Sequence, residues 1–257
     1  MVALLPLLIV AFVDAAHGLL SVRGSRGSPT VHRFDRRLAA AASSSTPTSP
    51  TYLLDENLEY MQSMRTIDSS SVSGRPSADL FEAVRYIDRN ANKLLYPTEE
   101  SKNSLWDRCK GSWKLQLATG GGRFTTFKPV PIFAYAMIDD KHFGNGVCLN
   151  SEFAILSLLG PHYFNSRTRQ MGIGIEDLFL FGNNVTPFAP GFVSEGMGLG
   201  KSQDDYKADK KRMPTFTMIG ASEKSLIARG GTGGIAIWTR LDSDIRPSAY
   251  GDYEFGV

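Results

Sequence analysis

The stretch from Ser225 to Leu241 constrains the fold more than any other part of this chain. Its sequence, SLIARGGTGGIAIWTRL, predicts a strand, a tight glycine turn and a second strand. The four glycines of the turn provide the positive-φ positions that a tight hairpin requires. A late hairpin that ends in Trp238 and Arg240 is typical of the closing edge of a barrel. Barrels of this size often hold an apolar ligand, so we expect binding rather than catalysis.

The patterning of the whole chain agrees with a barrel. The 257 residues include 25 glycines and 15 phenylalanines, which favours short strands and turns over long helices. From Trp106 onward, eight or nine short apolar or alternating segments are separated by turn signals. The sequence therefore predicts a mainly β protein, an antiparallel barrel of about eight strands with one or two N-terminal helices.

Charge and cysteine content exclude several classes of protein. Five arginines and two acids precede Thr51, so the rest of the chain carries 23 basic and 24 acidic residues and is close to neutral. A nucleic-acid partner is therefore not expected. The two cysteines, Cys109 and Cys148, are too few for a disulfide framework or a metal site. We expect buried, unreactive thiols, with a bridge between them as the alternative.

The first 50 residues resemble a targeting sequence. An apolar run, VALLPLLIVAFV, has the length of a signal-peptide core, and small residues follow it at Ala15 and Ala16. The segment from Leu19 to Pro50 is rich in arginine, alanine and serine and has one acid, which is typical of a transit peptide. This two-part presequence resembles that of algae whose plastids lie inside extra membranes. The alternative is a secreted protein with a basic leader.

The remaining chain divides into three parts. Residues 51–76 begin with a weak helical pattern and end in a serine-rich stretch, SSSVSG, which predicts a helix and a linker. Residues 77–241 form the barrel domain. Its first part, 77–104, is a helical lead-in with a stripe of apolar residues from Leu80 to Ala91. Residues 182–212 are rich in glycine, proline and charge, which predicts a long surface loop or lid. Residues 242–257 form a C-terminal tail.

Two segments at the ends of the barrel domain resemble one known family. They are Gly111–Thr119, GSWKLQLAT, which follows Leu105-Trp106, and Leu226–Trp238 with its Arg-Gly and Gly-Gly pairs. A glycine and a tryptophan that open a strand, and an Arg-Gly turn followed by an apolar strand, are similar to the plastid lipid-associated proteins, the fibrillins. The chain departs from that family before the Arg-Gly pair, where Glu223 is the nearest acid, and the resemblance covers about residues 77–241.

The resemblance implies a lipocalin-like fold and a non-catalytic function in the plastid. Its implied ligands are prenylquinones, carotenoids or galactolipids, bound in or on the barrel at the thylakoid or plastoglobule surface. Membrane contact would be peripheral. The loop of Phe124, Phe127, Pro129 and Pro131 with Lys128 would either touch lipid or be buried. One alternative is a structural subunit that docks on a photosynthetic complex, and another is a lipocalin-like enzyme that modifies isoprenoids.

The candidate binding residues are those that we expect to point into the barrel. Alternation along the predicted strands assigns an inward position to seven of them: Trp113, Leu115, Phe133, Tyr135, Phe153, Ile155 and Trp238. Arg229 is expected at the barrel mouth or in an ion pair with an acid such as Glu223. Each of these residues has a structural role as its alternative, either in the core or in an ion pair.

Motifs that would indicate catalysis or a cofactor were not found. Gly120–Gly122 lacks the Gly-Lys-Ser/Thr of a phosphate loop, and Gly230–Gly234 precedes a strand rather than a helix. Beyond residue 50 the two histidines, His142 and His162, lack the spacing of a metal pair. The sequence therefore predicts neither a catalytic residue, nor a metal, nor a cofactor.

Overall fold

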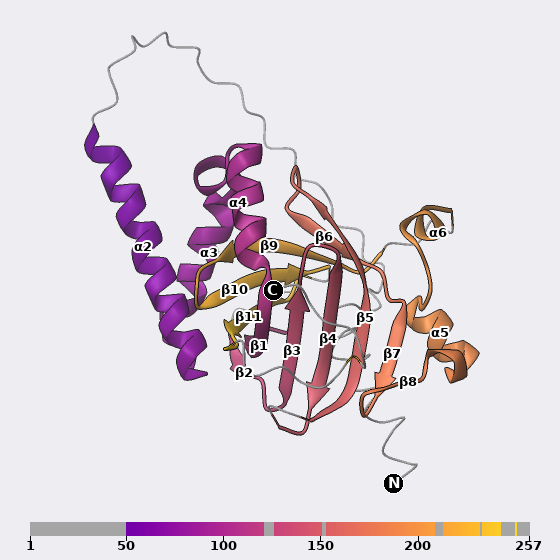
Figure 1. Ribbon diagram of the computed structural model, residues 1–257. Helices are drawn as coiled ribbons and strands as arrows, with labels where there is room; N and C mark the ends of the chain where they lie inside the picture. Colours follow the sequence, from indigo (N-terminus) through magenta and orange to yellow (C-terminus); the bar gives the residue numbers. More distant parts are fainter. Residues whose placement is uncertain are drawn as a thin grey trace, which may run out of the picture.

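Eight strands close into a barrel in the computed structural model, which describes residues 50–120, 126–150, 153–208, 213–231, 233–242 and 250 (Figure 1). Each barrel strand pairs antiparallel with the next one along the chain, and the last strand pairs with the first. This order defines an up-and-down barrel, so the predicted fold class is confirmed. The strands are β1 (Gly111–Ala118), β3 (Phe133–Ile138), β4 (His142–Cys148), β5 (Ala154–Asn165), β6 (Gln170–Ile173), β9 (Thr215–Ala221), β10 (Ser225–Gly230) and β11 (Ile235–Arg240).

The long strand β5 has two different neighbours on one side. Its first half pairs with β7 (Asp177–Leu180), and its last four residues pair with β6, while β4 runs along its other side. A short strand, β8 (Asn183–Asn184), extends the sheet beyond β7, and β2 (Lys128–Pro129) pairs with the end of β1. The sheet therefore branches at β5, and β7 and β8 project beyond the barrel wall (Figure 1).

Two helices cover one outer face of the barrel. The helix α2 (Pro50–Ser73) lies beside α3 (Leu80–Asn90); α2 packs on β10 and β11, and α3 packs on β9 (Figure 1). Apolar residues from α2 and α3, Ile67, Val84 and Ile87 among them, meet Ile227 and Ile237 of the sheet in one buried cluster. Packing on the sheet stabilises α2 and α3, because most of the stability of a protein helix comes from the burial of its apolar face. No described helix is long and apolar enough to cross a membrane.

The segment between α3 and β1 contains two further helices. A single π-helical turn, η1 (Ala91–Leu95), continues α3, and α4 (Glu99–Cys109) leads directly into β1. The sequence predicted a helical lead-in over 77–104 but not α4, which has few apolar residues and ends five residues later. Thr98 begins α4 with a capping box, in which its hydroxyl accepts from the Ser101 N–H and the Ser101 hydroxyl accepts from the Thr98 N–H.

Two other predictions of chain organisation are wrong. The serine-rich stretch is not a linker, because α2 continues to Ser73 and the Ser71 hydroxyl donates to the Trp238 carbonyl oxygen at 3.1 Å. The region 182–212 is not a plain loop, since it holds η2 (Thr186–Phe188), α5 (Gly191–Met197) and α6 (Gln203–Ala208). The predicted presequence up to residue 49 lies outside the described residues. In the predicted tail, Tyr250 is buried against Tyr135 and Phe179 on the outside of the barrel.

Candidate functional site

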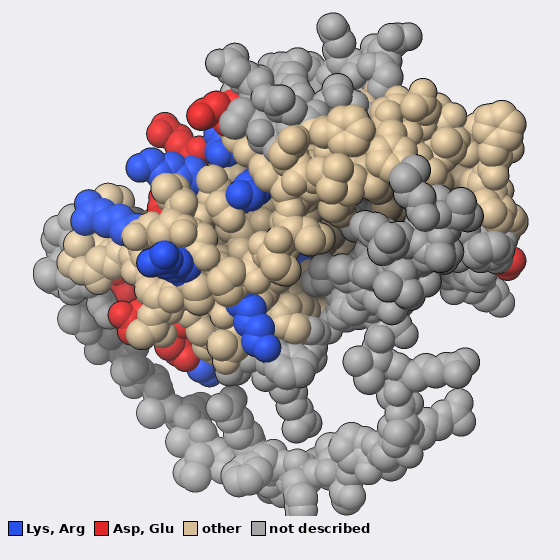
Figure 2. Space-filling view, turned by 90° about the horizontal axis from the view of Figure 1, so that it is seen from below, with Lys and Arg blue, Asp and Glu red and all other residues tan. Residues whose placement is uncertain are grey.

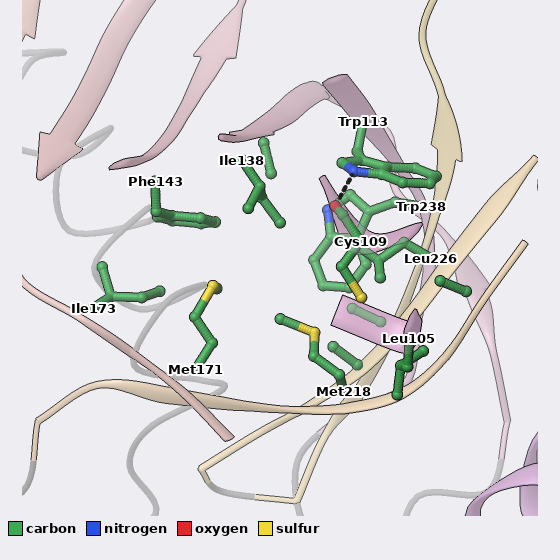
Figure 3. Packing of buried hydrophobic residues seen from close by; sticks show 14 of the residues in the cluster. Leu105, Cys109, Trp113, Ile138, Phe143, Met171, Ile173, Met218, Leu226 and Trp238 are labelled. Carbon is green, nitrogen blue, oxygen red and sulfur yellow. Dashed lines mark hydrogen bonds between the residues drawn. The ribbon is translucent and has the colours of Figure 1, made fainter. Parts of the chain in front are cut away.

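The helix α4 closes one end of the barrel. Leu105 and Cys109, both fully buried, pack against Trp113, Met218 and Leu226 of the barrel wall (Figure 3). The Trp113 indole N–H donates to the Cys109 carbonyl oxygen at 2.8 Å, which satisfies one of the free carbonyls at the helix C-terminus. The end of the helix and the first strand of the barrel are thereby held as one unit.

Arg240 completes this closed end. Its guanidinium lies over the Trp113 ring, 4.0 Å from the ring centre. It donates to the carbonyl oxygens of Arg108 and Lys110 at 3.0 Å and of Glu223 at 2.9 Å. Three carbonyl acceptors and an aromatic face together compensate the partial burial of this cation. The sequence places Arg240 at the end of the last strand, but no motif in it indicates this role.

The interior near α4 is filled by apolar side chains. Figure 3 shows Phe143, Met171 and Ile173 on one side and Met218, Leu105 and Trp238 on the other. Phe216 lies between two aromatic rings, with its centre 6.1 Å from Trp238 and 6.3 Å from Phe143. Phe216 thus links Phe143 of β4 to Trp238 of β11 through ring contacts.

Another part of the interior is less completely buried. Leu115, Asn145 and Phe216 face inward, because they are paired with or alternate with buried interior residues, and yet each is only half-buried. The wall around them is built from small side chains: Ala134, Ala136, Ala228 and Ala236. Short side chains on facing strands leave room that larger ones would fill. The part of the apolar interior around Leu115, Asn145 and Phe216 is therefore the candidate site, which we call the compartment.

One polar group faces this compartment. Asn145 lies opposite Ala136 on β3 and Leu158 on β5. Its side-chain oxygen is buried and has no hydrogen-bond partner among the described residues. The oxygen and nitrogen of an amide can exchange places by rotation, so the group can offer either a donor or an acceptor to a ligand. A single amide in an apolar compartment fits a ligand with one polar end.

The structure brings together three of the eight predicted site residues. Trp113, Leu115 and Trp238 all belong to the interior cluster, and Leu115 pairs directly with Trp238. Trp113 lies at the closed end, against α4, whereas Leu115 lies in the compartment. These three inward positions came from strands with a clear alternation of apolar and polar residues.

Phe133 and Tyr135 point outward, contrary to the prediction. They share a face with Met137 in a cluster on the outside of the barrel, and the Tyr135 hydroxyl lies 2.7 Å from that of Ser157. Both faces of β3 are apolar, so its alternation does not show which face is inside. A glycine on the next strand provides a local signal, because an added Cβ at Gly146 would lie 2.6 Å from the Tyr135 hydroxyl. The tyrosine ring occupies the space that this glycine leaves.

The other three predicted residues also lie outside the interior. Phe153 precedes β5 and is 45% exposed. Ile155 is the extra residue of a bulge between β4 and β5. Arg229 points outward and forms an ion pair with Asp88 of α3 rather than with Glu223. The prediction that Arg229 pairs with an acid is therefore confirmed, and the acid is Asp88, whereas Glu223 was the example expected.

Four interior or closing residues were missed by sequence reasoning: Phe143, Asn145, Phe216 and Arg240. For Asn145 a signal exists, since a polar residue between Gly144 and Gly146 is unusual in a buried strand. Nothing in the sequence marks Phe216 as an interior residue, because the segment before it mixes polar and apolar residues.

The two cysteines are buried and unpaired. Burial raises the pKa of the Cys109 thiol to about 12, although the nearby charges of Arg108 and Arg240 oppose this shift. Burial likewise raises the pKa of Cys148 to about 12. Neither thiol is activated as a nucleophile or a metal ligand. Within the described part of the chain, the histidines, cysteines and acids form no group suited to hold a metal ion.

His162 lies at the closed end, next to the Trp106 ring of α4, with ring centres 4.9 Å apart. Its Nε2–H donates to the Asp139 carbonyl oxygen at 2.8 Å, and its Nδ1 is buried with no hydrogen-bond partner in the described structure. Burial lowers the pKa of His162 and outweighs the opposing effect of Asp139, while His142 and Lys110 add to the lowering. The imidazole is therefore held neutral.

This burial predicts a pH-dependent stability. The unfolded chain binds a proton at His162 below about pH 6.5, whereas the folded chain binds it only at lower pH. The free energy of unfolding should therefore fall as the pH is lowered from about 6.5 toward the folded pKa. In His162→Phe this part of the slope should disappear, as measured by urea unfolding at several pH values. An unchanged slope in the variant would assign the effect to other groups.

Comparisons with known proteins give only distant likenesses. No protein-family model matches the sequence, and no curated protein matches it. Among solved structures, a lipocalin-like protein from Bacteroides uniformis ATCC 8492 is 16% identical, with a TM-score of 0.32 over 52% of this chain and 99% of that chain. An uncharacterized protein from Bacteroides eggerthii DSM 20697 is 14% identical, with a TM-score of 0.32 over 51% of this chain and 98% of that chain. The class of the present chain, a lipocalin-like up-and-down barrel, follows from its own strand pairing.

Proposed function

We propose that this protein is a non-catalytic, lipocalin-like carrier or store of lipid, and that its ligand is a prenyl lipid such as a prenylquinone or carotenoid. The observation that supports this most is the compartment lined by alanines, Leu115 and Phe216, with the amide of Asn145 as its polar group. A long apolar chain would lie along the alanine wall. A quinone carbonyl would accept from the Asn145 amide.

The location that we propose is the plastid, at the thylakoid or plastoglobule surface. The support is the two-part character of the first 50 residues, together with the resemblance of β1 and of the β10–β11 hairpin to the plastid lipid-associated proteins. Fluorescence microscopy of the full chain with a C-terminal fluorescent tag in a diatom tests the location. Export to the medium would contradict it and favour the secreted alternative.

The identity of the ligand is tested on protein purified from plastids without detergent. Native mass spectrometry should show a bound prenyl lipid, and the mass should return to that of the bare chain after solvent extraction. An empty barrel that also fails to take up prenylquinone would contradict the proposal. Turnover of the added isoprenoid would favour the enzymatic alternative, and comigration with chlorophyll on a native gel would favour a subunit of a photosynthetic complex.

Replacing Asn145 with leucine should separate ligand binding from stability. The free energy of unfolding should stay the same or rise by up to about 1 kcal/mol, because a buried amide oxygen with no described partner is replaced by an apolar group of similar volume. Affinity for a prenylquinone should fall by about tenfold, the value of one hydrogen bond. Quenching of tryptophan fluorescence by the quinone measures this affinity.

Asn183→Leu, at an exposed position in β8, is the matched control and should leave the quinone affinity unchanged. An unchanged affinity in Asn145→Leu would show that the amide does not contact the ligand.

A further inference from the structure

Large apolar side chains are exposed together at one edge of the barrel. Ile132 comes just before β3, Leu149 just after β4, Phe153 just before β5 and Phe181 just after β7. Their exposed fractions are 45%, 70%, 45% and 49%. The strand register places these four chain ends at the same edge, since Phe133 pairs with Cys148, Cys148 with Ala154 and Leu156 with Leu180. We call these four residues the apolar rim.

The rings of Phe153 and Phe181 lie next to each other, with centres 6.0 Å apart, although they come from different turns. The lower edge in Figure 1 holds the turns that carry the rim. Figure 2 views this edge from below. Charged side chains gather on the side of α2 and α3, and the side toward β7 and α5 carries almost none in the coloured area. The described part of this edge on the side of β7 and α5 is therefore largely uncharged.

Phe181 occupies a position that disfavours phenylalanine. Phe181 and Gly182 are the two central residues of the β7–β8 hairpin, and their φ angles are +50° and +77°. Positive φ at both positions defines a type I′ turn, for which Asn-Gly is strongly preferred. A bulky side chain at such a position is uncommon and strained, and residues strained in this way cluster at functional sites. Here it presents an aromatic ring to the solvent.

We propose that the apolar rim inserts into a lipid surface and holds the barrel at it. The rim residues lie at the ends of strands and are well exposed, which suits a soft partner. Its exposed area is a few hundred Å², with roughly 100 Å² from each phenylalanine. A stable dimer buries about 800 Å² on each partner, so a second copy fits this surface less well. A lipid surface has no such threshold, because each inserted side chain adds to the affinity.

This inference deepens the proposed function and rests on it for the nature of the cargo. The candidate compartment lies within the same barrel. Ala134 of β3 and Val147 of β4 face it, and the ends of these two strands carry part of the rim. A barrel held at the membrane by this edge would exchange an apolar ligand without passing it through water. In the aromatic loop expected to touch lipid or be buried, Phe127 is buried under α2 and α3, whereas Pro129 and Pro131 are exposed and Pro131 directly precedes Ile132 of the rim. Phe124 lies outside the described residues.

Flotation with phosphatidylcholine vesicles tests the rim. The full chain should float with the vesicles, and equal amounts of phosphatidylglycerol or added salt should change this little, because the described part of the rim edge is largely uncharged. The double variant Phe153→Ser/Phe181→Asn should bind at least about tenfold more weakly. Met61→Ser, which removes an apolar side chain of α2 that is 50% exposed, should bind like the parent. Equal binding by the rim variant, or loss of binding in salt, would overturn the inference.

The single variant Phe181→Asn gives a second readout. It should weaken vesicle binding and at the same time raise the midpoint of thermal unfolding by about 2–4 °C, since asparagine suits the turn. Weaker binding therefore cannot be attributed to unfolding. Light scattering of the same samples without vesicles tests whether the rim binds a second copy of the chain instead. A dimer that forms in the parent and dissociates in the rim variant would overturn the inference that the rim binds a lipid surface.

Quinone quenching in the absence of vesicles separates the two proposals. The rim variant should retain the quinone affinity of the parent. If vesicle binding depends on the rim but no prenylquinone binds, the proposal of a prenyl-lipid ligand is wrong and the inference about the rim is kept. If prenylquinone binds and the rim variant floats like the parent, the rim inference fails alone.

Discussion

Replacing Trp113 with alanine should lower the free energy of unfolding by about 3–5 kcal/mol. Trp113 is fully buried and contacts three separate parts of the fold: the α4 C-terminus, the β11 strand through Arg240, and the interior cluster. Its removal leaves a large cavity and also leaves the Cys109 carbonyl oxygen without this donor. Urea unfolding monitored by far-UV circular dichroism measures the change.

Trp113→Phe is the matched comparison for this prediction. It keeps an aromatic ring under the Arg240 guanidinium and loses the hydrogen bond, so its cost should be closer to about 1–2 kcal/mol. If alanine and phenylalanine destabilise the protein equally, the hydrogen bond dominates. A cost below about 1 kcal/mol for alanine would contradict the central role of this residue in closing the barrel.

Replacing Gly160 with valine should have a comparable effect, a loss of about 3–5 kcal/mol. A Cβ at this position would lie 2.2 Å from the Gly174 carbonyl oxygen and 2.9 Å from the Glu176 nitrogen. Both are backbone atoms, and the segment is held by hydrogen bonds from Gly174 N–H to Pro161 and from Glu176 N–H to Leu159. The crowding can be relieved only by breaking these bonds at the place where β5 changes partner.

Gly191→Ala provides the control, because no atom of the described residues lies within 4 Å of an added Cβ and the residue begins α5. Its effect should be within about 0.5 kcal/mol of zero. Differential scanning calorimetry on the two variants measures the difference. Near-native stability of Gly160→Val would show that the segment around Gly174 moves more easily than its hydrogen bonds suggest.

The sequence predicts best where one face of an element is polar. The alternation in β1 and the glycine turn between β10 and β11 identify three barrel strands, and with them Trp113, Leu115 and Trp238. The same reasoning fails for β3, because apolar residues on both faces leave its orientation undetermined. The outer face of β3 is apolar since Tyr250, far along the chain, packs on it. Such a contact cannot be found from local periodicity.

The helical part shows a second limit. The serines at the end of α2 suggest a linker by composition, and a tertiary contact overrides this preference, because Ser71 is fully buried against β11. The helix α4 has a charged, weakly amphipathic sequence, so its apolar pattern does not predict a helix. The capping box at Thr98 marks its start, but only in the structure. The position of the compartment depends on which alanines face each other across neighbouring strands. Its prediction requires the register of strand pairing, which local sequence does not give.

The pairing of β1 with β11 has a consequence for how the chain acquires its fold. Trp113 and Arg240 are partners in this pair although 127 positions separate them, whereas each other pair joins barrel strands that follow one another, with β7 and β8 inserted between β6 and β9. Local hairpins can form early, but the barrel can close only after the last strand has been made. Topologies dominated by such distant contacts fold in milliseconds to seconds. Until then β1 and β10 present unpaired edges, so a chain that lacks residues 235–240 should aggregate rather than form a smaller barrel.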